Sequence, residues 1–147
     1  MNTFFVVDNL SNSELSYDLI TAINDEKDLS CNIYFQNHAP PIIDPECLTL
    51  NITGLASAKG LAVAFDLASA LTILNANCNV KNIIYLYNLE WLQQSMDYML
   101  IRKILDNFDI YSRSESHIPI IQNLTNGKDV KFVPDMKEFF KCLKSQK

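Results

Sequence analysis

Short apolar runs of strand length alternate with longer amphipathic segments in this 147-residue chain, and this alternation constrains the fold more than any other feature. The clearest run covers residues 82–87 (Asn-Ile-Ile-Tyr-Leu-Tyr) and is typical of a parallel strand that is covered on both faces. Similar runs predict further strands at 3–7, 32–35, 47–52, 61–65, 109–112 and 130–133. Helical periodicity predicts helices over 13–24, 67–74, 90–108, 116–124 and 135–144.

This order of elements favours an α/β fold, because right-handed crossovers pack each helix back onto a parallel sheet. We predict one Rossmann-like domain over residues 1–147, a doubly wound, mostly parallel sheet with helices on both faces. Residues 54–75 leave an alternative open, since their alanine-rich sequence can be helical throughout. We prefer a strand at 61–65 and a helix capped by Asp66, and either Asn12 or Ser13 can cap the first helix.

Composition argues against two classes of partner. The formal net charge is -5, and the lysines Lys137, Lys141, Lys144 and Lys147 are interrupted by Glu138, so we expect no nucleic-acid partner. No apolar segment reaches the ~20 residues that cross a bilayer, so we expect no membrane partner. The first residues lack the basic start and small-residue cleavage site of a signal peptide, which predicts a soluble, cytoplasmic protein.

The sequence also lacks the usual cofactor motifs. Its cysteines, Cys31, Cys47, Cys78 and Cys142, are widely spaced, which predicts reduced structural thiols and no metal site. Its three glycines cannot form G-x-G-x-x-G or G-x-x-x-x-G-K-[ST], and G-x-S-x-G is missing as well. We therefore expect no cofactor, and neither NAD binding, P-loop phosphate transfer nor α/β-hydrolase chemistry.

Polar residues that follow the predicted strands are the candidates for a ligand site, because ligands of parallel sheets bind beyond the carboxyl ends of the strands. The candidates are Asp8, Asn9, Thr53, Asp66, Asn88, Glu90, Trp91, Arg113, Ser114, Glu115 and His117. Asp8 and Asp66 could either cap helices or accept hydrogen bonds from ligand hydroxyls. These residues define the expected crevice.

The segment 112–117 (Ser-Arg-Ser-Glu-Ser-His) places a cation, a carboxylate and an imidazole at a strand-to-helix turn, which can bind an anion. The structural alternative is that Ser114 or Ser116 caps the helix and Arg113 pairs with an acidic neighbour. Histidine is a common acid-base residue, but the sequence gives His117 no partner, and a structural or solvent role is the alternative.

The segment 88–91 (Asn-Leu-Glu-Trp) places a carboxylate and an indole directly after a buried strand. Aromatic faces stack well on sugars and bases, so the pair could line the mouth of the crevice. The alternative is that Glu90 starts the next helix and Trp91 packs under the neighbouring loop.

These two segments resemble turns in the Rossmann-like N-terminal half of GT-B glycosyltransferases, and more closely in glycosyltransferase-like proteins of tailed bacteriophages. In that phage group one strand ends in polar-Leu-Glu-Trp and a later one in Arg-Ser-Glu-Ser-His, matched here at 88–91 and 113–117. Residues 60–70 are also similar, so the resemblance covers roughly the second half of the chain. It implies a domain that binds a sugar or nucleotide-sugar, in the host cytoplasm if the chain is phage-encoded.

The resemblance also implies roles for individual residues. In a catalytic form, Arg113 would hold a phosphate or acidic sugar group, Glu90 and Asp8 would accept sugar hydroxyls, Trp91 would stack, and His117 would act as the base. A GT-B enzyme has two Rossmann-like domains, and the E-x7-E element of the donor-binding half has no counterpart here. Catalysis would then need a second glycosyltransferase half or a homodimer. The alternatives are a non-catalytic phage interaction module and a small-molecule hydrolase.

Overall fold

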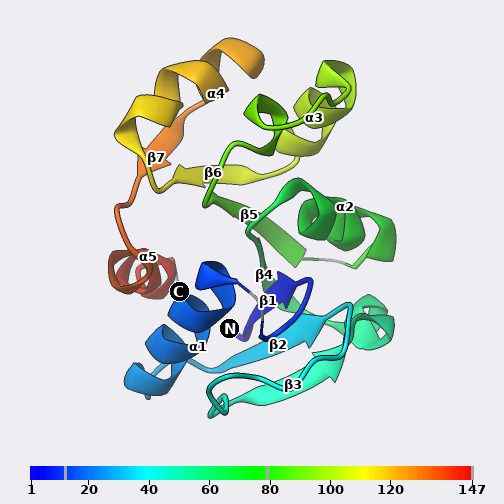
Figure 1. Ribbon diagram of the computed structural model, residues 1–147, viewed down its shortest axis with the longest axis vertical. Coiled ribbons are helices and arrows are strands. Elements are labelled where there is room, and N and C mark those ends of the chain that lie inside the picture. Colours follow the sequence, from blue (N-terminus) through cyan, green and yellow to red (C-terminus); the bar gives the residue numbers. More distant parts are fainter. Residues whose placement is uncertain (12, 79, 147) are drawn as a thin grey trace.

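The computed structural model describes residues 1–11, 13–78 and 80–146, and its centre is a seven-stranded, fully parallel sheet (Figure 1). The strands are β1 (Thr3–Val7), β2 (Cys31–Phe35), β3 (Leu48–Asn51), β4 (Gly60–Ala64), β5 (Val80–Leu86), β6 (Asp109–Ser112) and β7 (Val130–Phe132). Their spatial order is β3-β2-β1-β4-β5-β6-β7. The chain therefore reverses its direction of winding between β1 and β4, which is the topological switch point.

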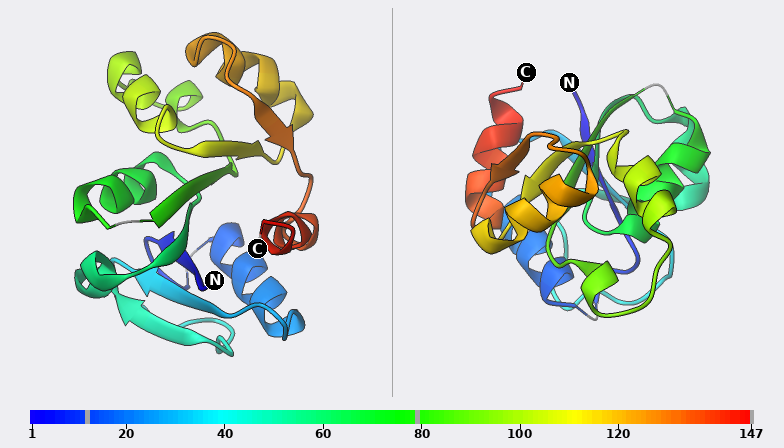
Figure 2. Two further views of the ribbon diagram at one scale, coloured as in Figure 1. Left: turned by 180° about the vertical axis from the view of Figure 1, so that it is seen from behind. Right: turned by 90° about the horizontal axis from the view of Figure 1, so that it is seen from above.

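Helices cover both faces of the sheet, so the predicted α/β class is confirmed (Figure 2). One face carries α1 (Glu14–Asp25) and α5 (Met136–Lys144), and the other carries α2 (Leu67–Ala76), α3 (Tyr98–Leu105) and α4 (Ile118–Leu124). Side chains alternate between these two cores, because Phe5 and Val7 of β1 enter the first and Phe4 and Val6 enter the second. No helix in the described ranges is long and apolar enough to span a bilayer.

Three helices begin at side-chain caps of the same kind, and the sequence predicts two of these caps, Ser13 and Asp66. Ser13, Asp66 and Asp135 each accept a hydrogen bond from the backbone N–H three residues later, at 3.1, 2.6 and 2.9 Å. The preferred division of residues 54–75 is therefore confirmed, since β4 is followed by α2 with Asp66 as its cap. The alternative cap Asn12, and Lys147 of the terminal lysine series, lie outside the described residues.

The prediction of a single helix over 90–108 is wrong. Residues Glu90–Leu92 form a 3-10 turn, η2, and α3 begins only at Tyr98. Asp97 starts this new helix, because its Oδ1 accepts a hydrogen bond from the backbone N–H of Met99 at 2.9 Å. Leu92 and Met99 are 60% and 72% exposed, so these two apolar residues of the predicted helix lie on the surface.

The helix predicted over 116–124 is shorter than expected. A 3-10 turn, η3 (Glu115–His117), precedes α4, and neither element has a side-chain cap. The reading of Ser114 or Ser116 as a helix cap is therefore wrong; their hydroxyl groups instead hydrogen-bond to each other at 2.8 Å. Pro119 suits the first turn of α4 because that position needs no backbone N–H donor.

Candidate functional site

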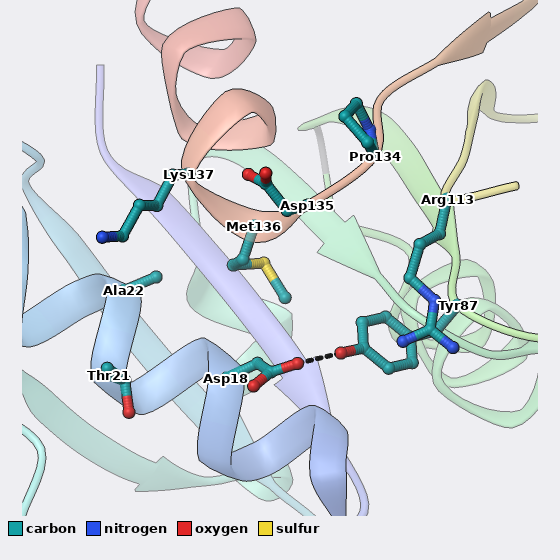
Figure 3. Close-up of a pocket in the computed structure, with 9 residues that line it drawn as sticks. All are labelled: Asp18, Thr21, Ala22, Tyr87, Arg113, Pro134, Asp135, Met136 and Lys137. Carbon is teal, nitrogen blue, oxygen red and sulfur yellow. Dashed lines mark hydrogen bonds between the residues drawn. The ribbon is translucent and has the colours of Figure 1, made fainter.

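Two cavities open at the carboxyl ends of the strands, and Tyr87 lines both. The first, which we name the switch-point cavity, has a volume of about 350 Å³ and lies where β1, β4 and β5 end. Its polar lining includes Asp8, Asn9, Ser13, Asp66, Asn88 and Glu90. The second, the α1–α5 cavity, has the same volume of about 350 Å³, and its lining includes Asp18, Thr21, Arg113, Asp135 and Lys137 (Figure 3).

Asp8 joins the ends of β1 and β2 at one wall of the switch-point cavity. Its Oδ2 accepts a hydrogen bond from Asn9 Nδ2 at 2.9 Å, and its Oδ1 accepts one from Asn37 Nδ2 at 2.6 Å. The backbone oxygen of Asp8 also accepts the N–H of Asn37 at 2.7 Å. Each carboxylate oxygen has a second lone pair, so this held carboxylate can still accept a hydrogen bond from a ligand.

Glu90 and Asp66 converge on the N-terminus of α2 at the opposite wall. Glu90 Oε1 accepts a hydrogen bond from the backbone N–H of Leu67 at 2.8 Å, beside the Asp66 cap. Burial raises the pKa of Glu90, and the neighbouring Asp66 carboxylate raises it further, while the Leu67 amide opposes both effects. No described residue donates a hydrogen bond to Glu90 Oε2, which leaves an acceptor at the cavity.

Tyr87 forms the boundary between the two cavities, and Arg113 packs on its ring at the α1–α5 cavity. The Tyr87 hydroxyl donates a hydrogen bond to Asp18 Oδ2, and the Arg113 guanidinium lies 3.7 Å from the Tyr87 ring centre (Figure 3). Burial and the Asp18 hydrogen bond raise the pKa of Tyr87 to about 12, so its hydroxyl remains a donor at neutral pH. Arg113 Nη1 also lies 3.7 Å from Glu14 Oε1, so Arg113 pairs with an acidic neighbour, as the structural alternative for this segment predicts.

The structure brings five predicted site residues together and separates the rest. Asp8, Asn9, Asp66, Asn88 and Glu90 line the switch-point cavity, and Arg113 lines the adjoining one. The other candidates, within the described part of the chain, line neither cavity: Thr53, Trp91, Ser114, Glu115 and His117.

The residues that lie apart have different surroundings. Thr53 is exposed in the 3-10 turn η1 (Ile52–Ser57) that follows the edge strand β3. Trp91 is 6% exposed and belongs to the core, so it packs as the structural alternative predicts and offers no stacking face to the crevice. His117 has a buried Nδ1 without a hydrogen-bond partner among the described residues, so no group there orients it as a base.

Four of the residues that line the α1–α5 cavity were not predicted from the sequence: Asp18, Thr21, Tyr87 and Lys137. Tyr87 was the last residue of the predicted strand 82–87, and its place at the strand end was a usable signal. Asp18 lies one helical turn after Glu14, so both acidic side chains share a face of α1. Nothing in the sequence marks Lys137 as a site residue, because its position depends on the return of α5 to the face of the sheet that carries α1.

The fold and the cavities define an α/β protein with a polar site at the switch point of a parallel sheet. The described residues contain no group of three or more His, Cys, Asp or Glu side chains arranged to hold a metal ion. Searches of family models, curated proteins and solved structures find no match to this chain.

Proposed function

We propose that this protein binds a sugar or nucleotide-sugar, with the sugar in the switch-point cavity. The observation that carries the proposal is the convergence of three carboxylates and two amides, Asp8, Asp66, Glu90, Asn9 and Asn88, in a cavity of about 350 Å³. Carboxylates accept hydrogen bonds and amides both donate and accept them, which matches the paired donor and acceptor character of sugar hydroxyls. The resemblance of residues 88–91 to a glycosyltransferase turn supports the same ligand class.

Charge distinguishes the two cavities in a way that fits a nucleotide-sugar. The described lining of the switch-point cavity has no cationic side chain, which favours an uncharged sugar there. Arg113 and Lys137 line the adjoining α1–α5 cavity, where a phosphate could find opposite charge although Asp18 and Asp135 also lie there. Glycosyl transfer would require a second half or a second copy to complete the active site.

Thermal melting in the presence of ligand tests the proposal. The panel comprises nucleoside diphosphate sugars, free nucleotides and simple glycans. A ligand at a hundredfold excess over its dissociation constant stabilises the folded chain by about 2.7 kcal/mol. For a domain of this size that corresponds to a rise in melting temperature of about 5 to 10 °C.

Two variants place the binding site. Asn88 lies in the cavity with an exposed side chain, so Asn88→Ala should weaken binding with little effect on folding. Thr53→Ala is the matched control, because Thr53 is exposed and outside both cavities. The proposal would be contradicted if the protein melted cooperatively and no ligand of the panel shifted its melting temperature. It would also be contradicted if Asn88→Ala bound the ligand as tightly as the wild type.

A second candidate function, a protein-interaction module, is favoured by one specific observation. Exposed apolar side chains, Leu92, Tyr98, Met99 and Ile120, surround a cavity of about 410 Å³ between η2, α3 and α4. Apolar patches of this kind often mark binding surfaces. Analytical ultracentrifugation of wild type and Met99→Ser over a range of concentrations tests self-association, and a wild type that stays monomeric throughout would count against this face as a homodimer interface.

A further inference from the structure

Two cysteines lie in matching positions where β2 and the edge strand β3 begin. Asn32 of β2 pairs with Leu48 of β3 in parallel register, so the preceding residues, Cys31 and Cys47, occupy matching positions. Adjacent strands lie about 4.8 Å apart, which falls within the Cα separation of about 4.4 to 6.8 Å that a disulfide needs. Each thiol also shifts the pKa of the other, as expected for two sulfur atoms that lie close together.

A small reagent can reach this pair from solvent. Both cysteines line an open cavity of about 330 Å³ between the end of α1 and the start of β3. Glu26, Lys27 and Glu46 supply its charged lining. Cys31 is only 9% exposed and packs on the core, whereas Cys47 is partly exposed at the cavity wall.

The two thiols are chemically unequal. The neighbouring Cys31 thiol lowers the pKa of the Cys47 thiol, whereas Cys47 together with burial raises the pKa of Cys31. The thiolate is the reactive form of cysteine, so Cys47 is suited to the first attack, and the position of Cys31 beside it suits Cys31 to resolve the product.

We propose that Cys31 and Cys47 form a reversible redox pair that reacts with low-molecular-weight disulfides such as glutathione disulfide. The Cys47 thiolate attacks one sulfur of the small disulfide, whose S–S bond breaks and releases one thiolate. Cys31 then gives up its proton, attacks the Cys47 sulfur of the mixed disulfide and releases the second thiolate. The two protein thiols lose two electrons, the small disulfide gains them, and the two protons end on the released thiols.

The disulfide would constrain a segment that reaches the switch-point cavity. It would close the loop from Cys31 to Cys47, which contains Asn37, the donor that holds Asp8 Oδ1 at 2.6 Å. Forming the disulfide would therefore constrain Asn37, which holds the Asp8 carboxylate of the proposed sugar site. The thiol chemistry itself does not depend on that site.

Peptide mapping of the folded protein tests the pair directly. Tryptic cleavage leaves both cysteines in one peptide, residues 28–59, and cleavage after Glu46 then divides that peptide between them. After treatment with glutathione disulfide, we expect the peptide to lose the mass of two hydrogen atoms and to resist alkylation. Its two fragments should stay joined until a dithiol reduces them, while Cys78 and Cys142 remain open to alkylation.

Matched serine variants identify the attacking thiol. Cys78→Ser should form the disulfide as the wild type does, whereas Cys47→Ser should form none and should react with glutathione disulfide at Cys31 at least about tenfold more slowly. Melting curves show whether each variant folds, and if Cys47→Ser does not fold, the wild-type peptide map decides. A stable glutathione adduct on Cys47 without the internal bond, or a bond that forms only in denaturant, would overturn the proposal.

Discussion

Replacing Glu90 by glutamine or by alanine separates the structural role of this side chain from its proposed role in binding. Glu90 Oε1 accepts the backbone N–H of Leu67 at the start of α2, at 2.8 Å. A glutamine side chain keeps an acceptor at that place and removes the half-buried negative charge beside Asp66. Glu90→Gln should therefore match or exceed the stability of the wild type, whereas Glu90→Ala leaves the Leu67 amide without its partner.

The magnitude follows from the loss of one helix-capping hydrogen bond. Such losses cost about 1 to 2 kcal/mol of unfolding free energy. At about 2 to 4 °C per kcal/mol for a chain of this length, Glu90→Ala should melt about 2 to 8 °C below the wild type. Glu90→Gln should melt within about 2 °C of the wild type or above it.

The pH dependence has a definite sign. Burial raises the pKa of Glu90 above its ordinary value of 4.5, so the folded chain binds this proton more tightly than the unfolded chain. The contribution of Glu90 to the free energy of unfolding therefore increases as the pH falls through the raised folded pKa toward 4.5, and it decreases as the pH rises. The stability of the wild type relative to Glu90→Gln should improve over that interval.

Urea unfolding at several pH values, combined with ligand titration, provides the assay. We expect Glu90→Gln to fold normally and to lose affinity for the ligand, because an amide cannot replace both carboxylate oxygens as acceptors. The reasoning fails if Glu90→Gln loses as much stability as Glu90→Ala at neutral pH. It also fails if the wild type loses stability relative to Glu90→Gln as the pH falls toward 4.5.

Three further outcomes follow from other contacts. Gly60→Ala should cost more than about 2 kcal/mol in chemical denaturation, because Gly60 has φ +129° and an added Cβ would lie 2.1 Å from the backbone oxygen of Asn2. Tyr85→Phe should cost about 1 to 3 kcal/mol in the same assay, because the buried hydroxyl donates to the Val133 oxygen at 2.9 Å; an unchanged midpoint would contradict this. The disulfide-linked form of the protein should have a free energy of unfolding about 2 to 3 kcal/mol higher than that of the reduced form. Equal urea midpoints for the two forms would contradict this prediction.

The strands were predictable because each buried strand is a short run of apolar residues that can be recognised without knowledge of its neighbours in the fold. Runs such as 82–87 are apolar on both faces, and Asp66 marks the start of α2 whatever packs around it. The break before α3 was missed because the apolar period continues across it, although Leu92 and Met99 are exposed.

The candidate site was predictable only where it depends on strand ends. Asp8 and Glu90 follow β1 and β5, and these strands end at the same edge of the sheet. Trp91 follows the same strand but turns into the core, which residue order does not specify. Lys137 and Asp18 line one cavity only because α5 packs beside α1, a contact between segments far apart in sequence.

The central position of β1 has a consequence for folding during synthesis. All five residues of β1 are buried, and β4 supplies one of its two neighbours. Since β4 ends at Ala64, a nascent chain that has formed only β1 to β3 presents an open, apolar strand edge to solvent. Unpaired edges of this kind recruit other strands. Ribosome pausing before β4 emerges would therefore expose this chain to aggregation, whereas a pause after β4 would leave β1 protected on both sides.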